Sequence, residues 1–104
     1  MRSFMLETNT YFDGAVRSVG FTRNGRRQTV GVIDTGSFHF GTDAAERMTI
    51  VSGEVSVKRD GEDAWTTYAA GTAFEVAGKS GFDIKASAPA AYVCEFLLTR
   101  ENGP

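Results

Sequence analysis

The only histidine of the chain, His39, lies seven residues before Glu46 in the segment GSFHFGTDAAERMTIVSG, residues 36–53. An imidazole and a carboxylate can bind divalent transition metals, and they are also side chains that proteins commonly use to move protons. A tightly held transition metal needs three or more nitrogen, oxygen or sulfur ligands in a fixed geometry. His39 and Glu46 are the best set of ligands that this chain offers. The sequence therefore predicts a site that works without a metal.

The segments that must position these side chains are short and rich in β-branched and aromatic residues. Turn signals separate them about every eight to twelve residues, which is typical of β-sandwiches and barrels. No segment has a sustained helical period, and twelve glycines provide candidates for the corners. We therefore predict an all-β fold, a small single-domain jelly-roll barrel.

Two hairpins are the clearest local predictions. Asn24-Gly25 separates RSVGFT from RQTVGVID, and Asn-Gly supplies the positive φ angles of a tight turn. Asp60-Gly61 follows EVSVK and predicts a second tight turn. Elsewhere apolar residues alternate with other residues, which places them on one face of a strand. These positions are Phe38 and Phe40, Met48 and Ile50, Phe74 and Val76, Phe82 and Ile84, and Tyr92, Cys94, Phe96 and Leu98.

The length and composition predict one globular domain, residues 1–104, with a core over roughly residues 7–98 and frayed termini. Hydrophobic residues make up 41% and charged residues 23% of the chain, and the net charge is −2. This charge argues against a nucleic-acid polymer as partner.

No stretch has the pattern of a signal peptide or a membrane span, so we expect a cytoplasmic protein without a membrane partner. The single Cys94 fits a reducing compartment and is expected to be a small core residue, not a nucleophile.

The segment around His39 and Glu46 resembles the first motif of the cupin family, G-x5-H-x-H-x3,4-E-x6-G, with Gly41 at the position of the other histidine. The second cupin motif is similar to GTAFEVAGKSGF, which begins at Gly71 and has Phe82 where the family has a histidine. The resemblance implies a cupin-like barrel. Its departures imply that ordinary polar side chains serve at the mouth in place of a metal ion.

A closer resemblance extends over roughly residues 7–98. The segments NTYFDGAVRSVGF, RRQTVGV, ERMTIVSGEVSV, AGTAFEV and AYVCEFL are similar to the small cupins known as pyrimidine/purine nucleoside phosphorylases. This resemblance implies phosphorolysis of nucleosides to a free base and ribose 1-phosphate, with broad tolerance of the base. It also implies inorganic phosphate as co-substrate, no metal or other cofactor, and a homodimer. The chain departs from the family pattern at residues 77–81, AGKSG, where members have Pro-Gly before a polar pair.

Phosphorolysis needs a group that holds the phosphate, and Arg27 is the first candidate. A guanidinium offers a planar fork of donors that matches phosphate oxygens, and Arg27 lies where a strand leaves the Asn-Gly turn. Arg26 and Lys79 are further candidates. The alternative is that Arg27 is an ordinary solvated charge at a strand end.

Glu46 is the candidate to accept hydrogen bonds from the ribose hydroxyls and to favour positive charge on the sugar. The alternative is a surface ion pair with Arg47. His39 is the candidate to donate a proton or hydrogen bond to the departing base. Two rules disagree about its direction, because alternation with Phe38 and Phe40 points it outward and the cupin register points it inward.

Tyr11, Phe40 and Tyr92 are the candidates for a wall on which a nucleobase stacks, since every base has a π face. Two other interpretations remain open. One is a non-catalytic cupin that binds a small sugar or nucleotide, and the other is a metal-dependent cupin enzyme. A small β-domain also leaves strand edges that pairing across a twofold axis would cover, which again predicts a homodimer.

Overall fold

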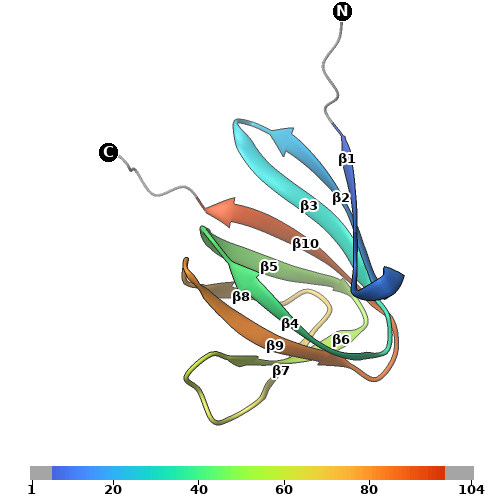
Figure 1. Cartoon of the computed structure of the whole chain (residues 1–104), viewed down its shortest axis with the longest axis vertical. Coiled ribbons are helices and arrows are strands. Elements are labelled where there is room, and N and C mark those ends of the chain that lie inside the picture. Colours follow the sequence, from blue (N-terminus) through green and yellow to red (C-terminus); the bar gives the residue numbers. More distant parts are fainter. Residues whose placement is uncertain (1–5, 98–104) are drawn as a thin grey trace, which may run out of the picture.

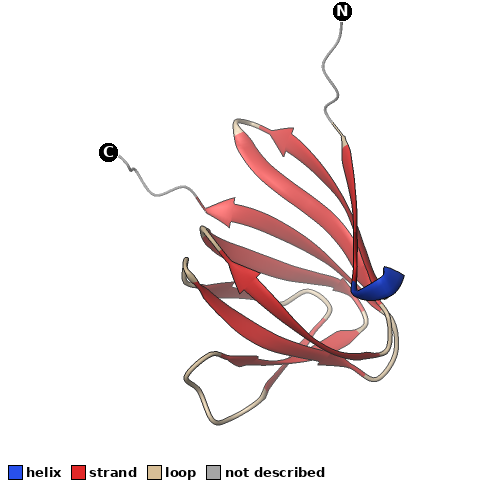
Figure 2. Cartoon of the chain, in the orientation of Figure 1, coloured by secondary structure: helices blue, strands red, loops and turns tan. Residues whose placement is uncertain are grey.

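The computed structural model describes residues 6–97, which form ten strands and one turn of 3-10 helix (Figure 1). In chain order the elements are β1 (Glu7–Tyr11), η1 (Phe12–Gly14), β2 (Val16–Arg23), β3 (Arg26–Ile33), β4 (Gly36–Thr42), β5 (Ala45–Ser52), β6 (Glu54–Arg59), β7 (Thr66–Ala69), β8 (Ala73–Val76), β9 (Ser80–Ala86) and β10 (Ala90–Leu97). The prediction of an all-β fold is confirmed (Figure 2). The predicted fraying of the termini and the placement of Leu98 concern residues outside the described range. Within residues 6–97 no helix is long and apolar enough to cross a membrane.

The strands pair into two antiparallel sheets. One has six strands in the order β1-β2-β3-β10-β5-β8, and the other has four in the order β4-β9-β6-β7. The sheets lie opposite each other (Figure 1) and share one apolar core, to which Ile50 and Cys94 contribute from the first sheet and Val57 and Ile84 from the second. The inner face of the six-stranded sheet is therefore the surface on which a site between the sheets can be built.

The first predicted hairpin is confirmed. Asn24 and Gly25 have φ angles of 53° and 72°, and Arg23 pairs with Arg26 directly across the turn. Both angles lie in the left-handed region that a type I′ turn requires, and asparagine and glycine adopt it most readily. This turn sets the register of β2 and β3, and with it the face on which each side chain of β3 lies.

The second predicted hairpin joins the expected strands through a longer loop. The backbone N–H of Glu62 donates to the carbonyl of Arg59, and Gly61 has a φ angle of 87°, so a turn forms where the sequence indicated it. However, β7 begins only at Thr66, which pairs with Val57. The prediction of a tight turn was wrong here because residues 63–65 separate the turn from the returning strand.

The predicted alternation of apolar residues is confirmed throughout the described range. Met48, Ile50, Phe74, Val76, Phe82, Ile84, Tyr92 and Cys94 are buried, and Phe38, Phe40 and Phe96 pack against the same core. By contrast, the sequence patterns did not predict β1, which lies at the edge of the six-stranded sheet and has no buried residue.

The turn that follows β1 brings an aromatic side chain back toward the core. Phe12 and Asp13 have φ angles of 54° and 55°, a left-handed conformation that is rare for a bulky residue such as phenylalanine. The Phe12 ring lies 5.0 Å from the Phe38 ring and 6.1 Å from the Phe40 ring, centroid to centroid. These aromatic contacts hold the η1 turn over the end of β4.

Candidate active site

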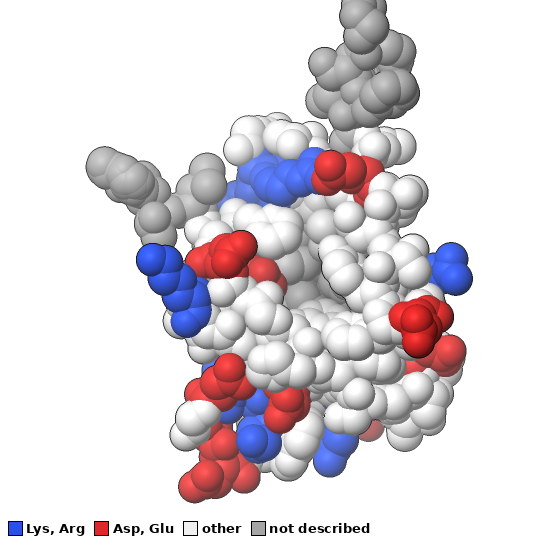
Figure 3. Space-filling model, in the orientation of Figure 1, with Lys and Arg blue, Asp and Glu red and all other residues white. Residues whose placement is uncertain are grey.

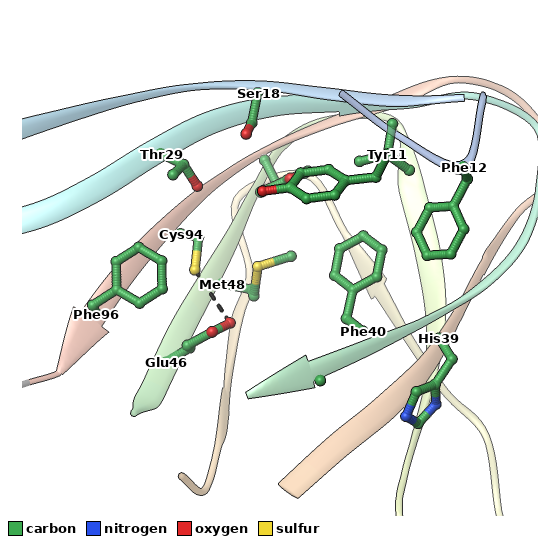
Figure 4. A pocket seen from close by; sticks show the side chains of 13 residues that line it. Tyr11, Phe12, Ser18, Thr29, His39, Phe40, Glu46, Met48, Cys94 and Phe96 are labelled. Atoms are coloured by element: carbon green, nitrogen blue, oxygen red, sulfur yellow. Dashed lines mark hydrogen bonds between the residues drawn. The ribbon is translucent and has the colours of Figure 1, made fainter. Parts of the chain in front are cut away.

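A pocket of about 230 Å³ lies between the inner face of the six-stranded sheet and β4. Figure 3 shows a hollow in the middle of this view that is bordered mainly by uncharged atoms, with charged atoms on its rim. The side chains around the pocket are drawn in Figure 4. Its polar side chains include Tyr11, Ser18, Thr29, Glu46, Tyr92 and Cys94, and its apolar walls include Phe12, Val16, Phe40, Met48 and Phe96.

Glu46 is the carboxylate of this pocket. It lies near the start of β5 in phase with the buried Met48, so its side chain lies on the inner face of the sheet. The thiol of Cys94 donates a hydrogen bond to Glu46 Oε1 at 3.4 Å (Figure 4). Burial raises the pKa of Glu46 above its ordinary value, the hydrogen bond from Cys94 partly offsets this, and the nearby Asp43 raises it further.

The alternative of a surface ion pair between Glu46 and Arg47 is wrong. Arg47 lies in the opposite phase of β5, and its guanidinium donates to Glu75 at 2.9 Å and to Glu95 at 3.4 Å. The strand therefore separates the two neighbours onto opposite faces of the sheet. Glu46 has no cation among the contacts that the described residues make to it.

Cys94 and Tyr92 face the same pocket from β10. Both side chains are buried, and burial raises the pKa of each well above its ordinary value. Both are therefore neutral near pH 7. Cys94 is a small core residue, as predicted, and in addition it is the hydrogen-bond donor to Glu46.

The three aromatic residues that the sequence singled out all line the pocket. Tyr11 arrives from the end of β1, Phe40 from β4 and Tyr92 from β10. Phe12 extends this surface, since its ring lies nearly parallel to that of Phe40, with 9° between the ring planes. In Figure 4 the rings of Tyr11, Phe12 and Phe40 lie together on the side of the pocket away from Phe96. This arrangement gives the pocket an aromatic end and a carboxylate end.

The hydroxyl groups of Ser18 and Thr29 form the polar wall on β2 and β3. Ser18 is only 6% exposed, and its hydroxyl accepts a hydrogen bond from the side-chain amide of Asn9 at 3.3 Å. Thr29 lies next to it on β3 and faces the same pocket (Figure 4). Such groups can donate hydrogen bonds to the oxygens of an anion or a sugar.

Arg27 lies on the inner face but not in the pocket wall. It is two positions from Thr29 on β3 and therefore has the same phase. Its guanidinium pairs with Glu7 of β1, on the side away from the pocket. Arg26 has the opposite phase on β3, and Lys79 lies between β8 and β9. Arg27 is thus the candidate cation that shares a sheet face with the pocket.

The structure decides the direction of His39. Phe38 and Phe40 turn inward, and His39 lies on the outer face, where its side chain is 54% exposed and its Nδ1 lies 2.8 Å from Asp83 Oδ1. Figure 4 shows the ring pointing away from Glu46 and Cys94. The alternation of the strand was the correct guide and the cupin register was wrong, because burying two phenylalanine rings outweighs burying one imidazole. His39 is nonetheless among the residues that border the pocket, and its role as proton donor stays a prediction.

Residues 6–97 contain no group of three or more histidine, cysteine, aspartate or glutamate side chains placed to hold a metal ion. The chemistry that the described pocket offers is that of hydrogen bonding, aromatic stacking and one desolvated carboxylate.

The comparison with known proteins places this pocket in a family. A family model described as pyrimidine/purine nucleoside phosphorylase matches residues 6–96. A protein of that name from Sorangium cellulosum is 67% identical over 93 residues, which are 89% of this chain and all of the relative. The chain belongs to the pyrimidine/purine nucleoside phosphorylase family.

Solved structures share the fold of this chain. A protein of unknown function from Vibrio parahaemolyticus has a TM-score of 0.87 and 47% identity, covering 88% of this chain and 98% of that one. A cupin domain of a transcriptional regulator from Enterobacter cloacae has a TM-score of 0.68 at 17% identity, covering 83% of this chain and 99% of that one. The second likeness concerns the fold alone, and it confirms the prediction of a cupin-like β fold.

Sequence reasoning placed Glu46, Tyr11, Phe40 and Tyr92 at one site, and the structure brings these four together. It did not place Thr29 or Phe96 there, nor the thiol of Cys94 beside Glu46. The alternation of β10 already put Cys94 on an inner face. The missing information was the pairing of β10 with β5, which joins residues 48 positions apart in the chain.

Proposed function

We propose that the chain is a nucleoside phosphorylase that cleaves purine and pyrimidine ribonucleosides with inorganic phosphate. The products are a free base and ribose 1-phosphate, and the reaction uses no metal. The proposal is carried by the family membership of a chain whose pocket joins one desolvated carboxylate to an aromatic wall. The relatives' name supports the reaction type, and the pocket supplies groups suited to each part of the substrate.

The reaction requires a proton as well as a phosphate oxygen. An oxygen of hydrogenphosphate forms a bond to C1′ of the ribose while the bond from C1′ to the base nitrogen breaks, and the electron pair of that bond leaves with the base. The proton of hydrogenphosphate ends on the base, so the products are a neutral base and the ribose 1-phosphate dianion. Positive charge develops on the sugar in the transition state, as the bond from C1′ to the base breaks. A fixed carboxylate stabilises this charge.

Glu46 is proposed to supply that carboxylate. Its position at the end of the pocket opposite Phe12 and Phe40 allows it to accept hydrogen bonds from ribose hydroxyls while the base lies on those rings. Desolvation strengthens its interaction with a developing positive charge, because less water screens it. The same burial makes the carboxylate form harder to maintain as the pH falls.

Tyr11, Phe40 and Tyr92 are proposed to bind the base, with Phe12 beside them. Stacking is tolerant of the base because purines and pyrimidines both present a π face. No arginine, lysine, aspartate or glutamate other than Glu46 lines the described pocket, so few charged groups are placed to discriminate between base edges. This composition supports broad base specificity.

Arg27 is proposed to bind the phosphate at the rim. The pairing of β3 with β10 ends at Gln28 and Glu95. One step further, the same register sets Arg27 beside Phe96 of β10, and Phe96 pairs with Glu46 of β5. Two strand spacings separate the backbones of Arg27 and Glu46, which is about 10 Å. An arginine side chain can span most of that distance, so phosphate held by Arg27 would lie over the sugar. We assign no step to His39, because its ring lies on the outer face.

Phosphate-dependent release of base tests this proposal. Purified protein is incubated with uridine or adenosine, with and without inorganic phosphate, and each mixture is repeated with a metal chelator. We expect both bases to be released only when phosphate is present, at rates that the chelator does not change. Nucleoside binding without release of base would favour the non-catalytic cupin, and loss of activity on chelation would favour the metal-dependent enzyme.

We also propose that the protein is a homodimer. The six-stranded sheet exposes Val30, Val32 and Val51, which are 43%, 51% and 50% exposed, and a second copy would cover such a face. Light scattering coupled to size-exclusion chromatography is expected to give twice the mass of the 104-residue chain. A monomer mass at micromolar concentration would reject the proposal.

A further inference from the structure

Arg27 is positioned by two residues that do not line the pocket. Its side chain starts on β3, crosses the inner face of β2 and ends at Glu7 on β1. Glu7 pairs with Gly20 of β2, and Gly20 pairs with Thr29 of β3. The guanidinium therefore lies over Gly20 and points away from the pocket that begins at Thr29.

Gly20 makes this route possible because it has no side chain. A Cβ atom added at Gly20 would lie 2.6 Å from Arg27 Nη2, closer than non-bonded carbon and nitrogen atoms approach, and 3.2 Å from Cζ, which is a tight contact. Any larger residue at this position would occupy the place where the guanidinium lies. Gly20 thus leaves the space in which the guanidinium of Arg27 reaches Glu7.

The contact with Glu7 is of the kind that a ligand can replace. The side chains of Arg27 and Glu7 are 39% and 68% exposed, and pairs with such exposure contribute little to stability. A phosphate offers the guanidinium the same oxygen geometry with a higher charge. An anion that Arg27 binds over the pocket would therefore draw the guanidinium away from Glu7.

We propose that Glu7 is a positioning residue that sets the affinity for inorganic phosphate by competing for Arg27 across Gly20. This inference rests on the proposed function in so far as phosphate is the anion that Arg27 receives. In the free protein Arg27 is held to Glu7, and on binding it turns over Thr29 toward the pocket. Glu7 contacts neither substrate, and its effect acts wholly through Arg27.

The test compares Glu7→Gln with wild type in two measurements. Calorimetric titration with inorganic phosphate gives its Kd without need of turnover, and steady-state kinetics give KM for phosphate and for the nucleoside separately. We expect Glu7→Gln to lower Kd and KM for phosphate about 1.5- to 5-fold, the range that corresponds to an exposed ion pair. The KM for nucleoside is expected to remain unchanged.

Controls separate competition for Arg27 from a general loss of negative charge. Glu75→Gln removes the same charge from another arginine–glutamate pair, on the outer face of the same sheet, and is expected to leave the Kd for phosphate unchanged. In an Arg27→Ala background, Glu7→Gln is expected to have no effect on that Kd. Gly20→Ala keeps every charge but blocks the route to Glu7, so it is expected to lower the Kd for phosphate as Glu7→Gln does.

Each outcome decides the inference. Three results would overturn the inference. One is an unchanged or higher Kd for phosphate in Glu7→Gln, and another is an equal effect of Glu7→Gln on that Kd in the Arg27→Ala background. The third is that neither wild type nor Glu7→Gln binds phosphate. If wild type releases base with phosphate but Glu7→Gln leaves the Kd and KM for phosphate unchanged, this inference is rejected and the proposed function stays intact. A tighter Kd in Glu7→Gln without any turnover would support the inference and reject the proposed function.

Discussion

Replacing Gly31 by alanine should both destabilise the protein and deform its pocket. A Cβ atom at Gly31 would lie 2.3 Å from Cζ, 2.4 Å from Oη and 2.6 Å from Cε2 of Tyr92, because the phenol ring lies flat on the glycine across the pair of β3 and β10. Tyr92 is only 5% exposed, so the space into which its rigid ring can move is that of the pocket that it borders. The ring or the backbone must shift, and Tyr92 is part of the pocket wall.

The size of the effect follows from two opposing terms. Overpacking a core site costs about 1–3 kcal/mol, and replacing glycine by alanine returns about 0.4–1 kcal/mol by restricting the unfolded chain. The expected net loss is about 1.5 kcal/mol, which for a domain of this size lowers Tm by roughly 6–12 °C. Because the displaced ring borders the proposed base site, KM for nucleoside should rise as well.

Chemical denaturation of wild type and four variants measures this effect. Gly41→Ala is the matched control, since a Cβ atom there would meet nothing within 4 Å, and it should leave stability unchanged or slightly higher. Tyr92→Leu removes the atoms that clash, so adding Gly31→Ala to it should cost nothing. If Gly31→Ala lowers the free energy of unfolding equally with tyrosine and with leucine at position 92, the contact does not explain the loss.

Three further predictions concern the site. Arg27→Ala should raise KM for phosphate roughly 10- to 100-fold, as expected for loss of charge-assisted hydrogen bonds, and Arg26→Ala, which has the opposite phase on β3, should not change it. The proposed reaction uses Glu46 as a carboxylate, and its pKa is raised, so kcat should fall as the pH drops through a value above that of an ordinary glutamate. Cys94→Ala removes a hydrogen bond that lowers this pKa and should move the acid limb of the kcat profile to higher pH, and an unmoved limb would refute the contact's role. His39→Ala should keep kcat within about twofold of wild type, because the ring pairs with Asp83 on the outer face, and a loss above about tenfold would restore a catalytic role to it.

The features that could be predicted from the sequence are those fixed by neighbours in the chain. Asn24-Gly25 specifies a tight turn through the conformations of two residues, and alternation along a strand assigns each side chain to a face. For this reason the core positions and the inward direction of Glu46 were predictable. The direction of His39 was also contained in the alternation, and only the motif spacing pointed the other way.

The features that could not be predicted depend on which strands pair. The thiol of Cys94 meets Glu46 because β10 lies beside β5 in a given register, and no local pattern specifies that register. The pairing of Arg27 with Glu7 depends on β1, an edge strand without an apolar face to reveal it. The longer loop after β6 likewise reflects where β7 meets its partner and not the turn residues themselves.

Following the fate of inorganic phosphate tests the central claim most directly. A phosphorus NMR spectrum of the protein with uridine and phosphate should show a ribose 1-phosphate signal that grows at the rate at which uracil appears. With Glu46→Gln that rate should fall about 100-fold, the loss expected when a charge that stabilises the transition state is removed. Release of uracil with the phosphate signal unchanged, or an equal rate of ribose 1-phosphate formation in Glu46→Gln, would contradict phosphorolysis at this pocket.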